Sequence, residues 1–255
     1  MSVLLTLAVH SLDSLLGGKS AIDMLDVPNL AMERLQLRGL VIEAGHLRGW
    51  EVDRYDAFRD RADKSGCPCL LLRDRTTINL LDGDGASSER IERLAMAANR
   101  LGCSSVSITP RVQDDEAAIQ MIVTRLRTAL QSVERLQLNL LVEPAEGLTS
   151  DPDRHIDLIK RIGGFRIGAL PVFSAAGATG EGLEALRKTA PYAAGIIADF
   201  PNGRGKKAVK PDEALRAIRE VGYSNIVALE YTGKSDPIRE LSKTREAMQA
   251  VLEEE

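Results

Sequence analysis

The sequence predicts a single-domain (β/α)8 TIM barrel that spans residues 1–255. Short apolar runs alternate with stretches of helical period from end to end, and no linker rich in Pro, Gly or Ser interrupts them. A doubly wound open sheet is the alternative, because it shows the same alternation. That fold expects a glycine-rich turn after its first strand, and Gly17-Gly18 lacks the required spacing. The barrel is therefore favoured.

The strands are predicted from runs rich in Val, Ile or Leu that show no regular polar alternation. Such runs are typical of parallel strands covered on both faces. In chain order they are Leu4–Val9, Gly39–Glu43, Cys69–Arg73, Ser104–Thr109, Leu138–Glu143, Ile167–Pro171, Ala194–Asp199 and Ile226–Tyr231.

The segments between these runs have the spacing of amphipathic helices. For example, Ile91, Leu94, Ala98 and Leu101 fall on one helical face. Local signals mark the helix ends. The expected N-terminal caps are Ser87 or Ser88, Asp114, Ser150 or Asp151, and Asp236 with Pro237, and the glycines expected after helix ends are Gly66, Gly102, Gly163 and Gly222.

Composition excludes several classes of protein. The chain has 33 Lys plus Arg against 37 Asp plus Glu, a net charge of −4, and 4% aromatic residues, which argues against nucleic acid as a partner. No apolar run approaches the roughly 20 residues that cross a bilayer, and the N-terminus does not resemble a signal peptide. Three cysteines without a metal-binding or redox spacing read as reduced thiols. We therefore expect a cytoplasmic protein that does not contact membranes.

Charged side chains stand where the predicted strands end, and in a barrel these ends form one mouth. Glu143 and Glu230 are the candidate catalytic acid/base pair, and His10 is a candidate general base or ligand. Buried carboxylates are costly unless paired, so such a group suggests a metal or a hydroxylated ligand, or structural ion pairs with arginines. The candidate substrate-binding residues at the other strand ends are Glu43, Arg73, Arg111 and Asp199.

Three further polar features carry less functional weight. His46 could pair with Glu43 at the second strand end. His155 is placed on the solvent side of the fifth helix. The basic segment around Arg204–Lys207 is either a phosphate-binding loop after the seventh strand or a solvated loop.

The order of several segments resembles the xylose isomerase-like TIM barrels, the superfamily of sugar phosphate isomerases/epimerases that also includes AP endonucleases. The resemblance is carried by Leu25–Pro28, Leu37–Glu43, Leu140–Glu143 and Gly222–Tyr231. It implies one divalent cation held by a Glu after strand five, an Asp after strand six, a His after strand seven and a Glu after strand eight. It also implies proton transfer next to a carbonyl.

Carried over to this chain, the first and last family ligands match Glu143 and Glu230, and the middle two do not. Pro171 or Val172 stands where the Asp is expected, and Ile196 or a neighbour where the His is expected. Hydrophobic side chains cannot coordinate a cation. The resemblance therefore implies Glu143 and Glu230 as metal ligands in an incomplete set, which predicts at most weakly bound Mn²⁺ or Mg²⁺ and no tightly bound cofactor.

Three explanations remain open at this stage. Asp199 could complete a rearranged cation site with His10 or Glu43. Glu143 and Glu230 could act without metal on a sugar-like ligand, facing each other across an open mouth. The chain could also be a degenerate paralogue, a pseudoenzyme that binds a small ligand or partner protein without turnover. Self-association into a homo-oligomer is allowed, but no exposed apolar stripe identifies an interface.

Overall fold

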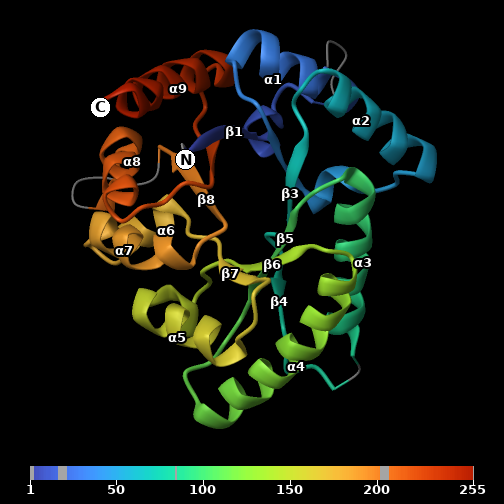
Figure 1. The fold of residues 1–255 in the computed structure, drawn as a ribbon, viewed down its shortest axis with the longest axis vertical. Coiled ribbons are helices and arrows are strands. Elements are labelled where there is room, and N and C mark those ends of the chain that lie inside the picture. Colours follow the sequence, from blue (N-terminus) through green and yellow to red (C-terminus); the bar gives the residue numbers. More distant parts are fainter. Residues whose placement is uncertain (1–2, 17–21, 84, 202–206, 255) are drawn as a thin grey trace.

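The computed structural model describes residues 3–16, 22–83, 85–201 and 207–254. Its eight main strands are all parallel and curl into a barrel in the order β7-β6-β5-β3-β2-β1-β9-β8, with helices as an outer ring (Figure 1). The strands are β1 Leu4–Ala8, β2 Leu40–Glu43, β3 Cys69–Arg73, β5 Ser105–Pro110, β6 Asn139–Val142, β7 Ile167–Ala169, β8 Gly195–Phe200 and β9 Ile226–Tyr231. A short extra strand, β4 Thr77–Ile78, pairs with the end of β5.

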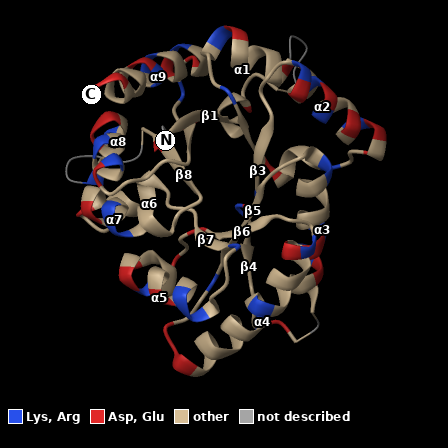
Figure 2. Cartoon of the chain, in the orientation of Figure 1, with Lys and Arg blue, Asp and Glu red and all other residues tan. Residues whose placement is uncertain are grey.

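The α-helices follow the strands in the alternating order that the sequence predicts. They are α1 Val27–Leu35, α2 Val52–Lys64, α3 Ala86–Leu101, α4 Glu116–Arg135, α5 Pro152–Ile162, α6 Phe173–Ala178, α7 Gly182–Thr189, α8 Pro211–Glu220 and α9 Pro237–Glu253. Charged residues of both signs alternate along the outer helices α2, α8 and α9 (Figure 2). Among the described helices, none is long and apolar enough to span a membrane.

The barrel closes at a narrow seam between β7 and β8. Parallel bridges there pair Ala169 with Ala193 and Val172 with Ile197, and the amide of Ile197 donates to the Pro171 carbonyl at 2.8 Å. Because proline has no N–H to continue a ladder, the pairing along β7 is short.

Two apolar cores hold the barrel. The larger core lies between the sheet and the helices and includes the fully buried Phe58 and Phe173. The smaller core takes residues from strands around the ring: Ala8, Val41, Leu71, Leu141, Leu170, Val172, Ile197 and Ala228. Layers of inward side chains of this kind fill the interior of a TIM barrel.

The structure confirms the barrel and all eight predicted strands, with ends that differ by a few residues. It adds β4, α6 and several short 3-10 helices, which are too brief to leave a periodic signal. Asp151 and Asp236 cap α5 and α9 as predicted, and Gly102 and Gly222 adopt the expected left-handed conformation with φ of 78° and 82°.

Two predicted caps are wrong. The residue before α3 is Gly85, and the amide of Ser87 donates to the Asp82 carboxylate at 2.8 Å. The carboxylate that caps α4 belongs to Asp115, one residue after Asp114, and it accepts from the amide of Ala118. In both cases several candidate cap residues adjoin one another, so the backbone turn decides which one is used.

Candidate functional site

Strand pleating explains how the charged residues reach one place. Successive side chains alternate between the two faces of a strand, so a residue two positions beyond an inward residue also points inward. Val41, Leu71, Leu141 and Ala228 belong to the interior core. The residues two positions further along are Glu43, Arg73, Glu143 and Glu230, which therefore meet inside the carboxyl end of the barrel.

Arg73 is the centre of this group, which we call the Arg73 cluster (Arg73, Glu43, Glu143 and Glu230). Its Nε and Nη2 atoms donate to the two carboxylate oxygens of Glu143 at 2.6 and 2.9 Å. Its Nη1 atom donates to Glu230 Oε2 at 2.8 Å and to Glu43 Oε1 at 3.4 Å. A planar guanidinium suits such bidentate pairing, and here it bridges three strands.

Two further residues complete the hydrogen bonding of the carboxylates. Arg75 Nη1 donates to the second oxygen of Glu230 at 2.9 Å, and the Ser107 hydroxyl donates to Glu143 Oε1 at 3.3 Å. The side chains of Arg73, Glu143 and Glu230 are only 3%, 5% and 1% exposed, whereas that of Arg75 is 43% exposed. Arg75 therefore forms the solvent-facing edge of the buried network.

Together with Arg75, the cluster contains two arginines, two glutamates that pair with them, and a third glutamate, Glu43, that can be protonated. Burial by itself lowers the pKa of Arg73, but the carboxylates of Glu143, Glu230 and Glu43 more than offset this and raise it, so Arg73 stays charged. Burial raises the pKa of Glu43 to about 8, although Arg73 and Arg75 oppose the shift. Arg73 and Arg75 thus balance Glu143 and Glu230, and Glu43 holds a proton at neutral pH.

Asp199 and the residues after β7 form a different half of the mouth. Asp199 Oδ1 accepts a hydrogen bond from the backbone amide of Ser174 at 2.8 Å, and burial raises the pKa of its carboxyl group. Val172 belongs to the interior core, whereas Ile196 belongs to the core between the sheet and the helices. This half therefore presents an apolar side chain where the sequence lacked the expected Asp, while Ile196, at the position of the expected His, faces the helices.

A second polar group lies after β1 and β2. Asp13 bridges two histidines: Oδ2 lies 2.7 Å from His10 Nδ1, and Oδ1 lies 2.8 Å from His46 Nε2. His46 is thus oriented by Asp13, with which the sequence had not linked it. A carboxylate bonded to one ring nitrogen orients the imidazole, and Asp13 does this for both histidines.

The donor set does not fit the divalent cation that the family resemblance implies. The guanidinium of Arg73 lies between Glu143 and Glu230, the two residues that match family ligands, and uses both oxygens of Glu143. Within the described ranges, no group of three or more His, Cys, Asp or Glu side chains is arranged to hold a metal ion. A cation could enter only by displacing a buried, charged arginine.

The structure places the other sequence candidates away from this centre. Arg111 is exposed, and in the described part of the chain no hydrogen bond or ion pair joins its side chain to the Arg73 cluster. The solvent-side placement of His155 is wrong: it is 2% exposed, and burial lowers its pKa to about 4, against the opposing effect of a hydrogen bond that the imidazole donates to the Val142 backbone. Residues 202–206 of the basic segment lie outside the described residues.

Sequence reasoning missed Asp13, Arg75 and Ser107. Two of them left a usable signal. Asp13 follows His10 by three residues, which suits contact across one helical turn, and Arg75 repeats the inward alternation of Arg73 two residues later. Ser107 left none, because a serine within a buried strand is ordinary.

Comparison with known proteins agrees with this architecture. The family model described as xylose isomerase-like TIM barrel matches residues 35–254. No curated protein sequence matches the chain. Similar solved structures include the probable 3-DHS dehydratase AsbF from Bacillus anthracis, with 14% identity, 98% of this chain and 99% of that chain covered, and a TM-score of 0.75.

Two other similar solved structures are of proteins named for different activities. An L-ribulose 3-epimerase shares 11% identity, with 99% of this chain and 95% of that chain covered and a TM-score of 0.78. AP endonuclease, family 2, from Brucella melitensis shares 13% identity, with 94% and 97% covered and a TM-score of 0.76. At these identities the likeness shows the fold alone, and a fold hosts many reactions.

Proposed function

The chain belongs to the xylose isomerase-like TIM barrel family, and we propose that it is a metal-independent member that binds a small, sugar-like ligand at the carboxyl mouth of the barrel. In this proposal the family's metal-assisted proton transfer is absent. The Arg73 guanidinium takes the place of the cation as the positive charge that holds Glu143 and Glu230 together.

One observation carries the proposal: Arg73 makes a two-point ion pair with Glu143 and a third bond to Glu230, all nearly excluded from water. A buried carboxylate engaged in this way is a poor base, because taking up a proton would break a charge-assisted pair in a low-dielectric site. Glu143 and Glu230 are therefore structural in this proposal, in place of the acid/base pair that the sequence suggested.

The class of ligand follows from the groups left at the mouth. Glu43 with its proton donates a hydrogen bond, and the half-exposed Arg75 retains donors beyond its single bond to Glu230. Hydroxyl and carbonyl oxygens match such donors. Several similar structures are named as epimerases of D-psicose and L-ribulose, which supports polyhydroxylated ligands as the first class to test.

The experiment measures metal content and melting temperature on the purified full chain. We expect no stoichiometric metal, no change with Mn²⁺ or a chelator, and a rise in melting temperature with one or more ketoses that needs no metal. Replacing the internal cation by Arg73→Ser should produce a Mn²⁺-dependent rise in melting temperature, because the freed carboxylates then surround an unfilled cavity. Arg75→Ser is the matched control and should not respond to Mn²⁺.

Two results would contradict the proposal. The first is stoichiometric metal in the wild-type protein that is lost in Glu143→Ala. The second is the absence of any ketose effect in both the presence and the absence of Mn²⁺. If Arg73→Ser does not fold, Arg73→Lys retains a positive charge and should remain folded and unresponsive to Mn²⁺.

A second candidate function is proton transfer without metal, as in an isomerase or epimerase. It is favoured by Glu43, which has the most exposed side chain of the three cluster glutamates, at 11%, and only a long 3.4 Å bond to Arg73. A pKa near 8 suits a group that gives and takes a proton at neutral pH. Conversion of any ketose that is abolished in Glu43→Gln, with binding retained, would establish this function.

A further inference from the structure

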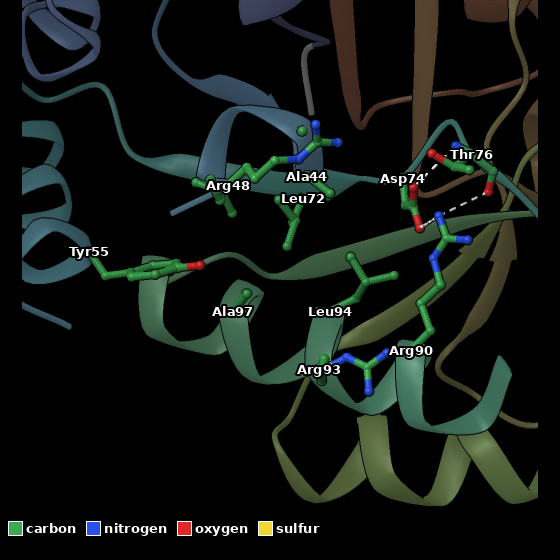
Figure 3. Close-up of a pocket in the computed structure, with 12 residues that line it drawn as sticks. Ala44, Arg48, Tyr55, Leu72, Asp74, Thr76, Arg90, Arg93, Leu94 and Ala97 are labelled. Atoms are coloured by element: carbon green, nitrogen blue, oxygen red, sulfur yellow. Dashed lines mark hydrogen bonds and ion pairs between the residues drawn. The ribbon is translucent and has the colours of Figure 1, made fainter. Parts of the chain in front are cut away.

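A pocket lies outside the barrel interior, between α2 and α3. Its volume is about 610 Å³, within the range of small-molecule sites. It is lined by Ala44, Gly45, Leu47, Arg48, Tyr55, Leu72, Asp74, Thr76, Arg90, Arg93, Leu94 and Ala97, and we call it the α2–α3 pocket. Figure 3 shows Leu72 and Leu94 in its centre, with the Tyr55 hydroxyl directed toward them.

The lining carries more positive than negative charge. Three guanidinium groups, those of Arg48, Arg90 and Arg93, face a single lining carboxylate, that of Asp74. In a protein with a net charge of −4, this surplus reverses the overall sign locally. A concave site with surplus arginines concentrates anions.

The three arginines differ in the number of hydrogen bonds and ion pairs that their side chains already make. Arg90 is engaged: it pairs with the buried Asp74 at 2.5 Å and donates to the Thr76 carbonyl at 3.3 Å, as the dashed lines in Figure 3 show. Arg93 has a 3.4 Å contact with Glu89, and both side chains are more than 60% exposed, so this pair is weak. The Arg48 guanidinium makes no hydrogen bond or ion pair with the described residues, and only the backbone amide of Arg48 is bonded, to the Gly45 carbonyl at 3.4 Å.

We propose that the α2–α3 pocket binds a small organic anion, a phosphate monoester or a carboxylate. Its charged group is held by Arg48 or by Arg93, which Figure 3 draws on opposite sides of Leu72 and Leu94, and its apolar body packs against those leucines. Arginine suits both anions because its planar fork matches their paired oxygens. The Arg90–Asp74 pair fixes one end of the pocket and leaves Arg48 and Arg93 for the ligand. The pocket borders the barrel mouth, because Ala44 and Asp74 directly follow Glu43 and Arg73, but no residue of the Arg73 cluster lines it, so this proposal does not depend on the proposed function.

Calorimetric titration of the full chain with four probes tests the proposal. Phenyl phosphate and benzoate represent the two anion classes, inorganic phosphate lacks the apolar body, and benzyl alcohol lacks the charge. We expect saturable binding of at least one aromatic anion, about tenfold or more tighter than inorganic phosphate, and none of benzyl alcohol. Whichever aromatic anion binds more tightly identifies the preferred charged group.

Variants assign the binding to the pocket. One of the two variants Arg48→Gln and Arg93→Gln should weaken binding about tenfold, since it removes a charge-assisted hydrogen bond, and the variant that does so identifies the arginine that holds the anion. Leu94→Glu should abolish it. Arg239→Gln, which alters a 76% exposed arginine on α9, is the control and should leave binding unchanged, whereas Arg75→Gln tests whether the anion binds at the barrel mouth instead.

Three results would overturn the proposal. These are no saturation by either aromatic anion up to about 10 mM, affinity that both pocket arginine variants leave unchanged, or affinity that falls in Arg75→Gln instead. The last result would place the anion at the barrel mouth.

Discussion

The two halves of the barrel mouth have opposite character. The half built from β2, β3, β6 and β9 gathers three glutamates around Arg73, whereas the half after β7 and β8 presents Val172 and Ile197, with Asp199 held by a backbone amide. Buried acids need a partner, and apolar side chains supply none. The difference shows that the side of the mouth with buried carboxylates also contains a buried arginine, Arg73, that pairs with them, whereas Val172 and Ile197 on the apolar side have no charge to pair.

The strongest way to break this comparison is to remove the internal cation. Arg73→Met should lower the free energy of unfolding by about 3–5 kcal/mol at pH 8, because it leaves buried carboxylates without their partner. Chemical denaturation of the variant and the wild-type protein at pH 8 measures the loss.

Arg75→Met is the matched control for that experiment. Arg75 also pairs with Glu230 but is 43% exposed, so its removal should cost about 1 kcal/mol or less. Equal losses for the two variants would mean that Arg73 has no special role in holding the charged half together.

Besides Asp199, the apolar half contains the buried titratable group His155, which borders the small cavity beside Val172 and Ala176. Its Nε2 atom has no hydrogen-bond partner in the described structure, and burial holds its pKa near 4, below the ordinary 6.5. Because the unfolded chain takes up the proton first, stability is complete above about pH 6.5 and is lost as the pH falls toward 4. The loss should reach about 3 kcal/mol.

Urea denaturation between pH 7 and 4 tests this in the wild-type protein and in His155→Gln, which does not titrate. The variant should lack the loss of stability that protonation of His155 causes between about pH 6.5 and 4. Parallel curves for the two proteins would show that His155 is protonated as easily in the folded state as in the unfolded state, and the apolar half would then be wetter than described.

The smallest effect concerns Glu43 and sharpens the account of the charged half. Its folded pKa, about 8, lies above the ordinary 4.5, so the folded protein holds this proton more tightly. The resulting stability is present below about pH 4.5 and disappears as the pH rises through 8. Glu43→Gln should therefore gain about 2 kcal/mol relative to the wild-type protein between pH 6 and 8.

Thermal denaturation across that pH range measures the difference in stability between Glu43→Gln and the wild-type protein. Glu146→Gln, at an exposed glutamate, is the control. A pH-independent difference between Glu43→Gln and the wild-type protein would mean that Glu43 is ionised in the folded state. The charge balance of two arginines against two glutamates would then be wrong.

The sequence predicted the strand ends well because the apolar run of a strand and the charged residue near its end are both local features of the sequence. A buried parallel strand leaves an apolar run, and Arg73, Glu143 and Glu230 each stand at or just beyond the end of one. The sequence also indicated that Pro171 or Val172, and Ile196 or a neighbour, stand where the resemblance implies an Asp and a His. It misplaced His155, because one polar residue on an amphipathic helix looks solvent-facing until the surrounding α6 and α7 are in place.

The sequence by itself determined the alternation of strands and helices, and therefore the barrel and the set of charged residues at its carboxyl end. Only the tertiary structure decided which charges meet. Arg73 lies 70 residues from Glu143 and 157 from Glu230 along the chain, and their pairing depends on strand register and on the radius of the barrel. Local periodicity fixes which way a side chain points, but electrostatic partners are set by distance in space.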